Sequence, residues 1–153
     1  MQQACVRPAG SRAQYCRRAV QQVMKSHVLV VGVGGVGGNA AECLVRGGVG
    51  RITLIDGDTV DPTNRNRQLV ALTSTEGQGK SEALAQRLRD INPAVVVEAI
   101  QTFLPPDSAA VDALISGHSP PLDFVVRTFA PPCLLLAWVQ FVLPGPCQHS
   151  RSE

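Results

Sequence analysis

The chain has 153 residues, of which 44% are apolar and 17% charged, and its formal net charge is +2. This balance excludes a charged disordered tail and gives no field for bulk nucleic-acid binding, while an aromatic content of 4% argues against a base-stacking module. The five cysteines are widely spaced, so we expect free thiols and no zinc site. The longest apolar stretch near the end, residues 133–143, is too short to span a bilayer, and no transmembrane segment is predicted.

Residues 1–26 form a basic leading segment that contains no acidic residue. The apolar residues Cys16, Val20 and Val23 recur at helical spacing, which predicts an amphipathic helix over about residues 12–25. The same Arg-rich, acid-poor composition is typical of an organelle transit peptide, which is the alternative interpretation. We therefore expect a cytoplasmic protein, or an organellar one if this segment is a transit peptide.

Residues 27–126 alternate apolar runs with segments of helical period. The pattern predicts strands over 28–31, 51–55, 95–100 and 122–126, and helices around 40–45 and over 79–91 and 107–115. Such alternation is typical of parallel βαβ units, so we expect an α/β fold, a Rossmann-like parallel sheet with helices on both faces. Residues 58–75 are polar and aperiodic, and a loop of this length is usually functional or disordered.

A glycine-rich loop joins the first predicted strand to the helix that follows it. The loop contains Gly32, Gly34, Gly35 and Gly37, and Asp56 follows the end of the next strand. Glycines let backbone N–H groups approach a phosphate at a helix N-terminus, and a carboxylate at this strand end can accept hydrogen bonds from ribose hydroxyls. The pattern predicts a nucleotide site. The alternative is that the glycines serve only the packing of helix against sheet.

The polar loop distinguishes two kinds of nucleotide enzyme. A dehydrogenase and an enzyme that adenylates an acid can both use this strand–loop–helix unit. Asn64, Arg67 and Gln68 lie in the loop, and Lys80 follows it. Attack at the α-phosphorus of ATP adds charge that Arg and Lys donors stabilise, whereas hydride transfer needs no such cations. The residues favour ATP; the alternatives are a solvated charge for Arg67 and a first-turn surface residue for Lys80.

These motifs resemble those of the ThiF/MoeB/HesA superfamily, the ATP-binding fold of ubiquitin-activating-type enzymes. The matching stretches are the glycine loop at 32–37, Asp-Gly-Asp-Thr-Val at 56–60, Asn-Arg-Asn-Arg-Gln at 64–68, and Lys80. Within the superfamily the chain is most similar to the tRNA threonylcarbamoyladenosine dehydratases, the TcdA or CsdL group, over residues 63–68, 71–72 and 87–93. The resemblance extends over about residues 27–93.

The resemblance implies a reaction and a set of roles. ATP would activate the carboxylate of the threonyl group on a tRNA adenosine, and the side-chain hydroxyl would then close a cyclic ester with loss of AMP. The glycine loop would hold the phosphates and Asp56 the ribose. Asn64, Arg67 and Gln68 would contact or position the phosphates, and Arg67 and Lys80 would be the catalytic cations.

The resemblance ends near Val126. The fourth strand of the family leads into a turn whose Asp binds Mg²⁺, but no Asp follows Asp123 in this chain, so no metal ligand is assigned. Asp123 precedes the predicted strand and is a poor substitute. Residues 127–153 contain four prolines and form a divergent tail. We therefore expect a sheet that is incomplete at its C-terminal side, in a chain that is the first part of a larger domain.

Other activities stay open at this point. The resemblance also fits activation of the C-terminal glycine of a ubiquitin-like or sulfur-carrier protein, or a non-catalytic nucleotide-binding remnant. An NAD-dependent oxidoreductase is the last alternative. A homodimer is expected only by analogy with the family. From the chain on its own we expect weak nucleotide binding and poor turnover.

Overall fold

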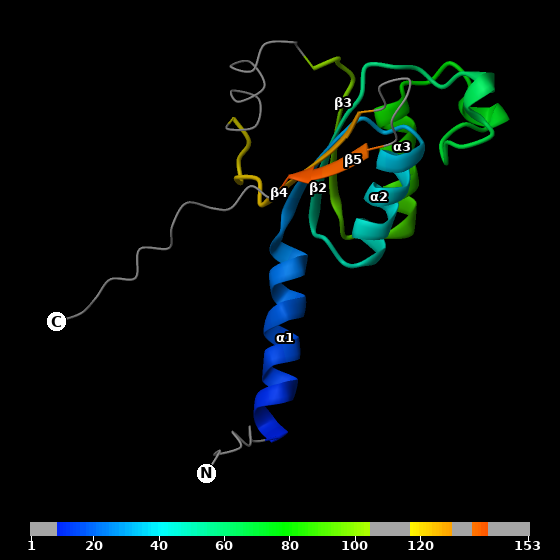
Figure 1. Cartoon of the computed structure of the whole chain (residues 1–153). Coiled ribbons are helices and arrows are strands. Elements are labelled where there is room, and N and C mark those ends of the chain that lie inside the picture. Colours follow the sequence, from blue (N-terminus) through cyan, green and yellow to red (C-terminus); the bar gives the residue numbers. More distant parts are fainter. Residues whose placement is uncertain (1–8, 105–116, 130–135, 141–153) are drawn as a thin grey trace.

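The computed structural model of the chain describes residues 9–104, 117–129 and 136–140 (Figure 1). In chain order its elements are α1 (Ala9–Lys25), β1 (His27–Val31), α2 (Gly35–Arg46), β2 (Arg51–Ile55), α3 (Lys80–Ile91), β3 (Val96–Ile100), β4 (Phe124–Phe129) and β5 (Leu136–Gln140). Two short 3-10 turns, Pro62–Asn64 and Thr73–Thr75, lie in the predicted long loop. The predicted alternation of strands and helices is therefore confirmed, and the helix expected over 107–115 lies outside the described residues.

The strands form one sheet in the order β3-β2-β1-β4-β5. The first four strands in this order are parallel, and β5 pairs with β4 in the antiparallel direction. The Rossmann-like parallel sheet is as predicted. The antiparallel β5 was not predicted, because its residues belong to the tail that shows no clean period. Strand β4 also continues to Phe129, three residues beyond the end expected for it at Val126.

Helices α2 and α3 lie side by side over one face of the sheet (Figure 1). Residues at helical spacing on both helices and alternate residues of the strands form the main core: Val28, Val30, Ala41, Val45, Ile52, Leu54, Leu84 and Leu88. A second cluster covers the opposite face and contains Leu29, Val31, Ile55, Leu122 and Val125. Strands β1 and β2 are thus buried on both faces, which explains why they read as continuous apolar runs.

Helix α1 projects away from the sheet, and only Ser26 separates it from β1 (Figure 1). It begins at Ala9, three residues before the predicted start, and the helix prediction is confirmed. Its apolar side chains Val20, Val23 and Met24 are exposed, with Val20 at 57% and Met24 at 60%. In the part of the chain that the structure describes, neither α1 nor any other helix is long and apolar enough to cross a membrane.

His27 anchors the amino-terminal end of β1. Its side chain is buried, with Nε2 2.9 Å from the Thr53 hydroxyl and Nδ1 2.9 Å from the Pro120 carbonyl. Its backbone N–H donates to the Asp123 carboxylate at 2.8 Å. Asp123 therefore lies at the amino-terminal end of the parallel strands, whereas the glycine loop lies at their carboxyl end. This distance from the glycine loop rules out Asp123 as a substitute metal ligand at the nucleotide site.

Burial shifts the protonation of the His27 ring. Desolvation is the main cause, and the positive charges of His118 and Arg51 add to it, so that the pKa of His27 lies below its usual 6.5. The Pro120 carbonyl and the Glu98 carboxylate oppose the shift. Because the folded chain favours the neutral ring, its contribution to stability is present above pH 6.5 and is lost as pH falls through the lower, folded pKa.

The variant His27→Gln tests this linkage. As the pH is lowered from 6.5 through the folded pKa of His27, we expect the free energy of unfolding of the native chain to fall, and the variant to show a smaller slope. The measurement is urea unfolding at several pH values. Equal slopes for both proteins in that window would contradict the assignment.

Glu42 joins α2 to α3. Its carboxylate accepts from Arg87 Nε at 2.7 Å and pairs with Arg46 Nη2 at 2.8 Å, and its side chain is 13% exposed. The hydrogen bond from Arg87, followed by that from Arg46, holds the pKa of Glu42 below its usual value. Glu82 makes a looser pair with Arg89, at 3.3 Å and with both side chains about half exposed.

We expect Glu42→Gln to lower the free energy of unfolding at pH 7 by about 1 kcal/mol, because a partly buried charge-assisted pair is lost. The difference from the native chain should vanish once the pH falls below the folded pKa of Glu42. Chemical denaturation at neutral and acidic pH measures both effects. The matched variant Glu82→Gln should have nearly the same free energy of unfolding as the native chain. An equal loss in Glu82→Gln would show that the pair between Glu42 and Arg87 contributes no more to stability than an exposed ion pair.

Candidate functional site

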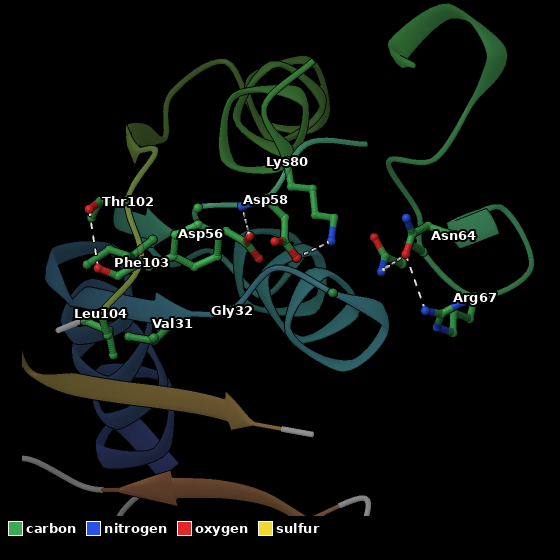
Figure 2. A pocket seen from close by; sticks show the side chains of 14 residues that line it. Val31, Gly32, Asp56, Asp58, Asn64, Arg67, Lys80, Thr102, Phe103 and Leu104 are labelled. Carbon is green, nitrogen blue, oxygen red and sulfur yellow. Dashed lines mark hydrogen bonds and ion pairs between the residues drawn. The ribbon is translucent and has the colours of Figure 1, made fainter. Parts of the chain in front are cut away.

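A pocket of about 370 Å³ lies where the carboxyl ends of β1, β2 and β3 meet. Its lining consists of Val31, Gly32, Gly34, Ile55, Asp56, Gly57, Asp58, Asn64, Arg67, Gln68, Lys80, Thr102, Phe103 and Leu104. Figure 2 shows residues 102–104 at one end, the Asn64 and Arg67 loop at the other, and Asp56, Asp58 and Lys80 between them. The structure therefore brings together most of the predicted site residues. Gly35 and Gly37 do not line the pocket and lie in the first turn of α2.

The glycine loop turns directly from β1 into α2. Gly32 has a φ of +83°, a conformation that favours glycine because a side chain would be strained there. A Cβ at Gly35 would lie 3.0 Å from the Arg67 carbonyl oxygen, a tight contact that would require the polar loop to shift by a few tenths of an ångström. No side chain caps the N-terminus of α2. By helix geometry its first N–H groups have no partner within the helix, and the positive end of its dipole favours an anion at the pocket.

Asp56 ties the glycine loop to the turn after β2. One carboxylate oxygen accepts from the Val33 backbone N–H at 2.7 Å and the other from the Asp58 backbone N–H at 2.8 Å. Each carboxylate oxygen can accept a further hydrogen bond, so these contacts leave capacity for a ligand hydroxyl. The predicted binding residue is thus also the residue that holds the loop in shape.

Lys80 is the first residue of α3, and it is buried, with 6% of its surface exposed. Its Nζ lies 2.7 Å from an Asp58 carboxylate oxygen, and its backbone N–H donates to the Asp58 carbonyl at 3.0 Å. The alternative interpretation of Lys80 as a surface residue is wrong. A buried cation at the positive end of a helix is unfavourable by itself, and Asp58 offsets that charge.

Asp58 is a site residue that sequence reasoning did not single out. It stands within the recognised Asp-x-Asp turn, so the signal was present, but nothing in the spacing showed that its carboxylate would face Lys80. Thr102, Phe103 and Leu104 were missed as well. Phe103 is 70% exposed and lies against Gly57, and no motif marks these three residues, which follow the end of β3.

The polar loop sends its two arginines in different directions. Arg67 lines the pocket, and its guanidinium donates to the Thr63 carbonyl at 3.2 Å and the Asn64 side-chain oxygen at 3.3 Å. Arg65 instead pairs with Glu76 at 2.7 Å and does not line the pocket. Arg67 is exposed, and these hydrogen bonds within its own loop orient its guanidinium.

The described residues contain no group of three or more His, Cys, Asp or Glu side chains that could hold a metal ion. In the chain without ligand, Asp56 accepts from backbone N–H groups and Asp58 pairs with Lys80. Arg67 and Lys80 are then the cations that this part of the chain can offer to an anion.

The sheet, its glycine loop and the pocket at the strand ends define a Rossmann-like α/β domain. The sequence profile of the ThiF family matches residues 9–129, and the chain belongs to that family.

The chain is similar to two named enzymes, one of which also has a solved crystal structure. The chain is 41% identical over 129 residues to the tRNA threonylcarbamoyladenosine dehydratase of Escherichia coli, covering 84% of this chain and 47% of that enzyme. It is 41% identical over 104 residues to the molybdopterin-synthase adenylyltransferase of Salmonella typhimurium, covering 67% and 41%. The crystal structure of the E. coli dehydratase in complex with ATP superposes with a TM-score of 0.67 at 39% identity, covering 80% of this chain and 48% of that one. The chain thus spans about half the length of these relatives or less.

The variant Asp56→Ala tests whether this carboxylate shapes the ligand-free site. Its removal leaves two backbone N–H groups without their acceptor, and we expect the free energy of unfolding to fall by about 2 kcal/mol with no ligand present. Denaturant unfolding measures this loss. The control is Asp61→Ala, since Asp61 accepts from Thr63 at the exposed start of a 3-10 turn outside the pocket. A loss no larger than that of the control would leave Asp56 without a structural role.

Proposed function

We propose that the chain binds ATP in this pocket and is the nucleotide-binding part of an adenylating enzyme of the tRNA threonylcarbamoyladenosine dehydratase type. The observation that carries the proposal is the placement of Arg67 and Lys80 beside the N-terminus of α2, where they and the backbone N–H groups face one pocket. Triphosphate is the nucleotide group that such a concentration of donors fits. Similarity to a dehydratase solved in complex with ATP supports it.

The two ends of the pocket suit the two ends of ATP. The base would lie against Phe103, whose exposed ring offers a stacking face. The ribose would bind at Asp56, and the phosphates at the glycine loop with Arg67 and Lys80. The volume of about 370 Å³ falls within the range of small-molecule sites.

The proposed reaction begins with attack of a substrate carboxylate on the α-phosphorus of ATP. The new oxygen–phosphorus bond forms as the bond to pyrophosphate breaks, giving an acyl adenylate. Negative charge grows on the phosphoryl oxygens in the transition state, and Arg67 and Lys80 would stabilise it. A nucleophile in the same side group then attacks the activated carbonyl and AMP leaves with one carboxylate oxygen, so the side group loses the elements of water.

A second candidate for the substrate that is adenylated is favoured by one specific observation, the similarity to a molybdopterin-synthase adenylyltransferase. In that case the carboxylate would belong to the C-terminal glycine of a small carrier protein, and the same two cations would act in the same first step. The described residues contain the nucleotide end of the site, which the two hypotheses share. A homodimer and the cellular compartment stay predictions.

Acceptor-dependent pyrophosphate exchange separates the two hypotheses. The dehydratase hypothesis predicts that tRNA carrying threonylcarbamoyladenosine stimulates exchange of labelled pyrophosphate into ATP, and that a carrier protein ending in Gly-Gly does not. Stimulation by the carrier protein alone would replace the first hypothesis with the second. ATP binding without any exchange would support a non-catalytic remnant.

The variant Arg67→Ala tests the phosphate contacts. We expect the Kd for ATP to rise about tenfold, the equivalent of about 1.4 kcal/mol, because one charge-assisted hydrogen-bond donor is removed. Isothermal titration calorimetry with ATP measures it. Arg65→Ala removes the same charge from the same loop, and since Arg65 pairs with Glu76 outside the pocket, its Kd should change less than twofold.

Equal losses in the two arginine variants would mean that net charge, and not the geometry of the pocket, attracts the nucleotide. Tighter binding of NADH than of ATP would overturn the assignment of the site.

A further inference from the structure

Gln68 carries a polar atom that the nucleotide does not account for. Its side chain lines the pocket and is only 8% exposed. Its Nε2 donates to the Asn64 side-chain oxygen at 2.7 Å, but its Oε1 is buried and has no hydrogen-bond partner among the described residues. A buried acceptor without a donor costs about 1–3 kcal/mol, so this atom calls for an explanation.

The orientation of the Gln68 amide follows from its neighbours. Asn64 Nδ2 donates to the Asp61 carbonyl at 3.2 Å, which turns Asn64 Oδ1 toward Arg67 and Gln68. Arg67 can only donate, and it meets that oxygen at 3.3 Å. If the Gln68 amide were reversed, its oxygen would face the Asn64 oxygen without a hydrogen between them. The loop therefore keeps Gln68 Nε2 on Asn64 and leaves Oε1 directed elsewhere.

An unpaired acceptor is the wrong group for a triphosphate. Phosphate oxygens accept hydrogen bonds, so they can pair with Arg67, with Lys80 and with backbone N–H groups, but not with a carbonyl oxygen. Gln68 Oε1 requires an N–H or O–H donor. The Gln68 amide lies next to the glycine loop, since a Cβ at Gly34 would lie 3.9 Å from its Nε2.

We propose that Gln68 Oε1 accepts a hydrogen bond from the threonylcarbamoyl group of the substrate and so holds its carboxylate beside the α-phosphorus. This inference rests on the function proposed above. A threonylcarbamoyl group carries urea N–H groups and a hydroxyl close to its carboxylate, and these are the donors that the orphan oxygen needs. Gln68 is then a residue that determines substrate specificity, while Arg67 and Lys80 bind the phosphates of the nucleotide.

The test measures discrimination between donors. Three probes are titrated into the full chain with a non-hydrolysable ATP analogue present: the threonylcarbamoyladenosine nucleoside, an analogue with its amino-acid urea nitrogen methylated, and an analogue with its side-chain hydroxyl replaced by hydrogen. We expect the native chain to bind the parent nucleoside about tenfold more tightly than at least one analogue, since a site built for a donor rejects a ligand that lacks it.

In the variant Gln68→Met this discrimination should disappear, whatever change in the Kd for the ATP analogue follows from losing the hydrogen bond to Asn64. Gln78→Met is the matched control, because Gln78 is exposed and lies outside the pocket, and it should keep the discrimination. Thermal unfolding of each variant shows whether it is folded.

Several outcomes would overturn the proposal. One is discrimination that persists in Gln68→Met, and another is weaker binding of the ATP analogue with unchanged binding of the nucleoside. Failure of the native chain to bind the nucleoside, with or without the ATP analogue, would also contradict it. A further one is paramagnetic broadening of the protein's NMR resonances by Mn²⁺ in the native chain but not in Gln68→Met, which would show that Oε1 binds a cation instead. The nucleoside and the ATP analogue are also titrated separately. Absence of ATP binding by the native chain would refute the proposed function, and this result is distinguishable from a failure of the proposal for Gln68.

Discussion

The carboxylate of Asp56 is the constraint on which the site depends. Its two oxygens hold the backbone N–H groups of Val33 and Asp58, so one side chain connects the glycine loop after β1 to the turn after β2. Asp58, held in this way, pairs with the amino group of Lys80 on α3. The glycine loop, the turn after β2 and the buried Lys80 therefore hold one another in position. This is possible because the adjacent parallel strands β1 and β2 have their carboxyl ends at the same side of the sheet.

The positive groups of the pocket are oriented before any anion arrives. Lys80 is held by Asp58, and Arg67 is held by carbonyl and amide oxygens of its own loop. Side chains that are already ordered lose little conformational entropy when they bind, and fixed donors stabilise developing charge without reorganising. The unpaired oxygen of Gln68 is the exception in this donor-rich surface. The site therefore has one part that suits phosphate oxygens and one atom, Gln68 Oε1, that suits an N–H or O–H donor of a ligand.

Much of the fold was predictable, because burial on both faces of a parallel sheet produces continuous apolar strands that alternate with helices of clear period. The bounds of α3 and β2 agree with the predicted segments. Strand β5 was not predictable, since an antiparallel edge strand is selected by pairing with β4, and its own residues show no alternation. The packing of α2 and α3 on the same face is likewise a property of the assembled sheet.

The sequence by itself determined the chemistry that this protein can offer: a glycine loop after a buried strand, a carboxylate after the next, and a polar loop with Asn64, Arg67, Gln68 and Lys80. These follow from local residue types and spacing. Only the tertiary structure decided which groups meet. It pairs Asp58 with Lys80 across 22 residues, turns Arg65 away, places Phe103 at the far end of the pocket and leaves the Gln68 oxygen without a donor. Such contacts are set by how strand ends converge in space, which spacing along the chain does not encode.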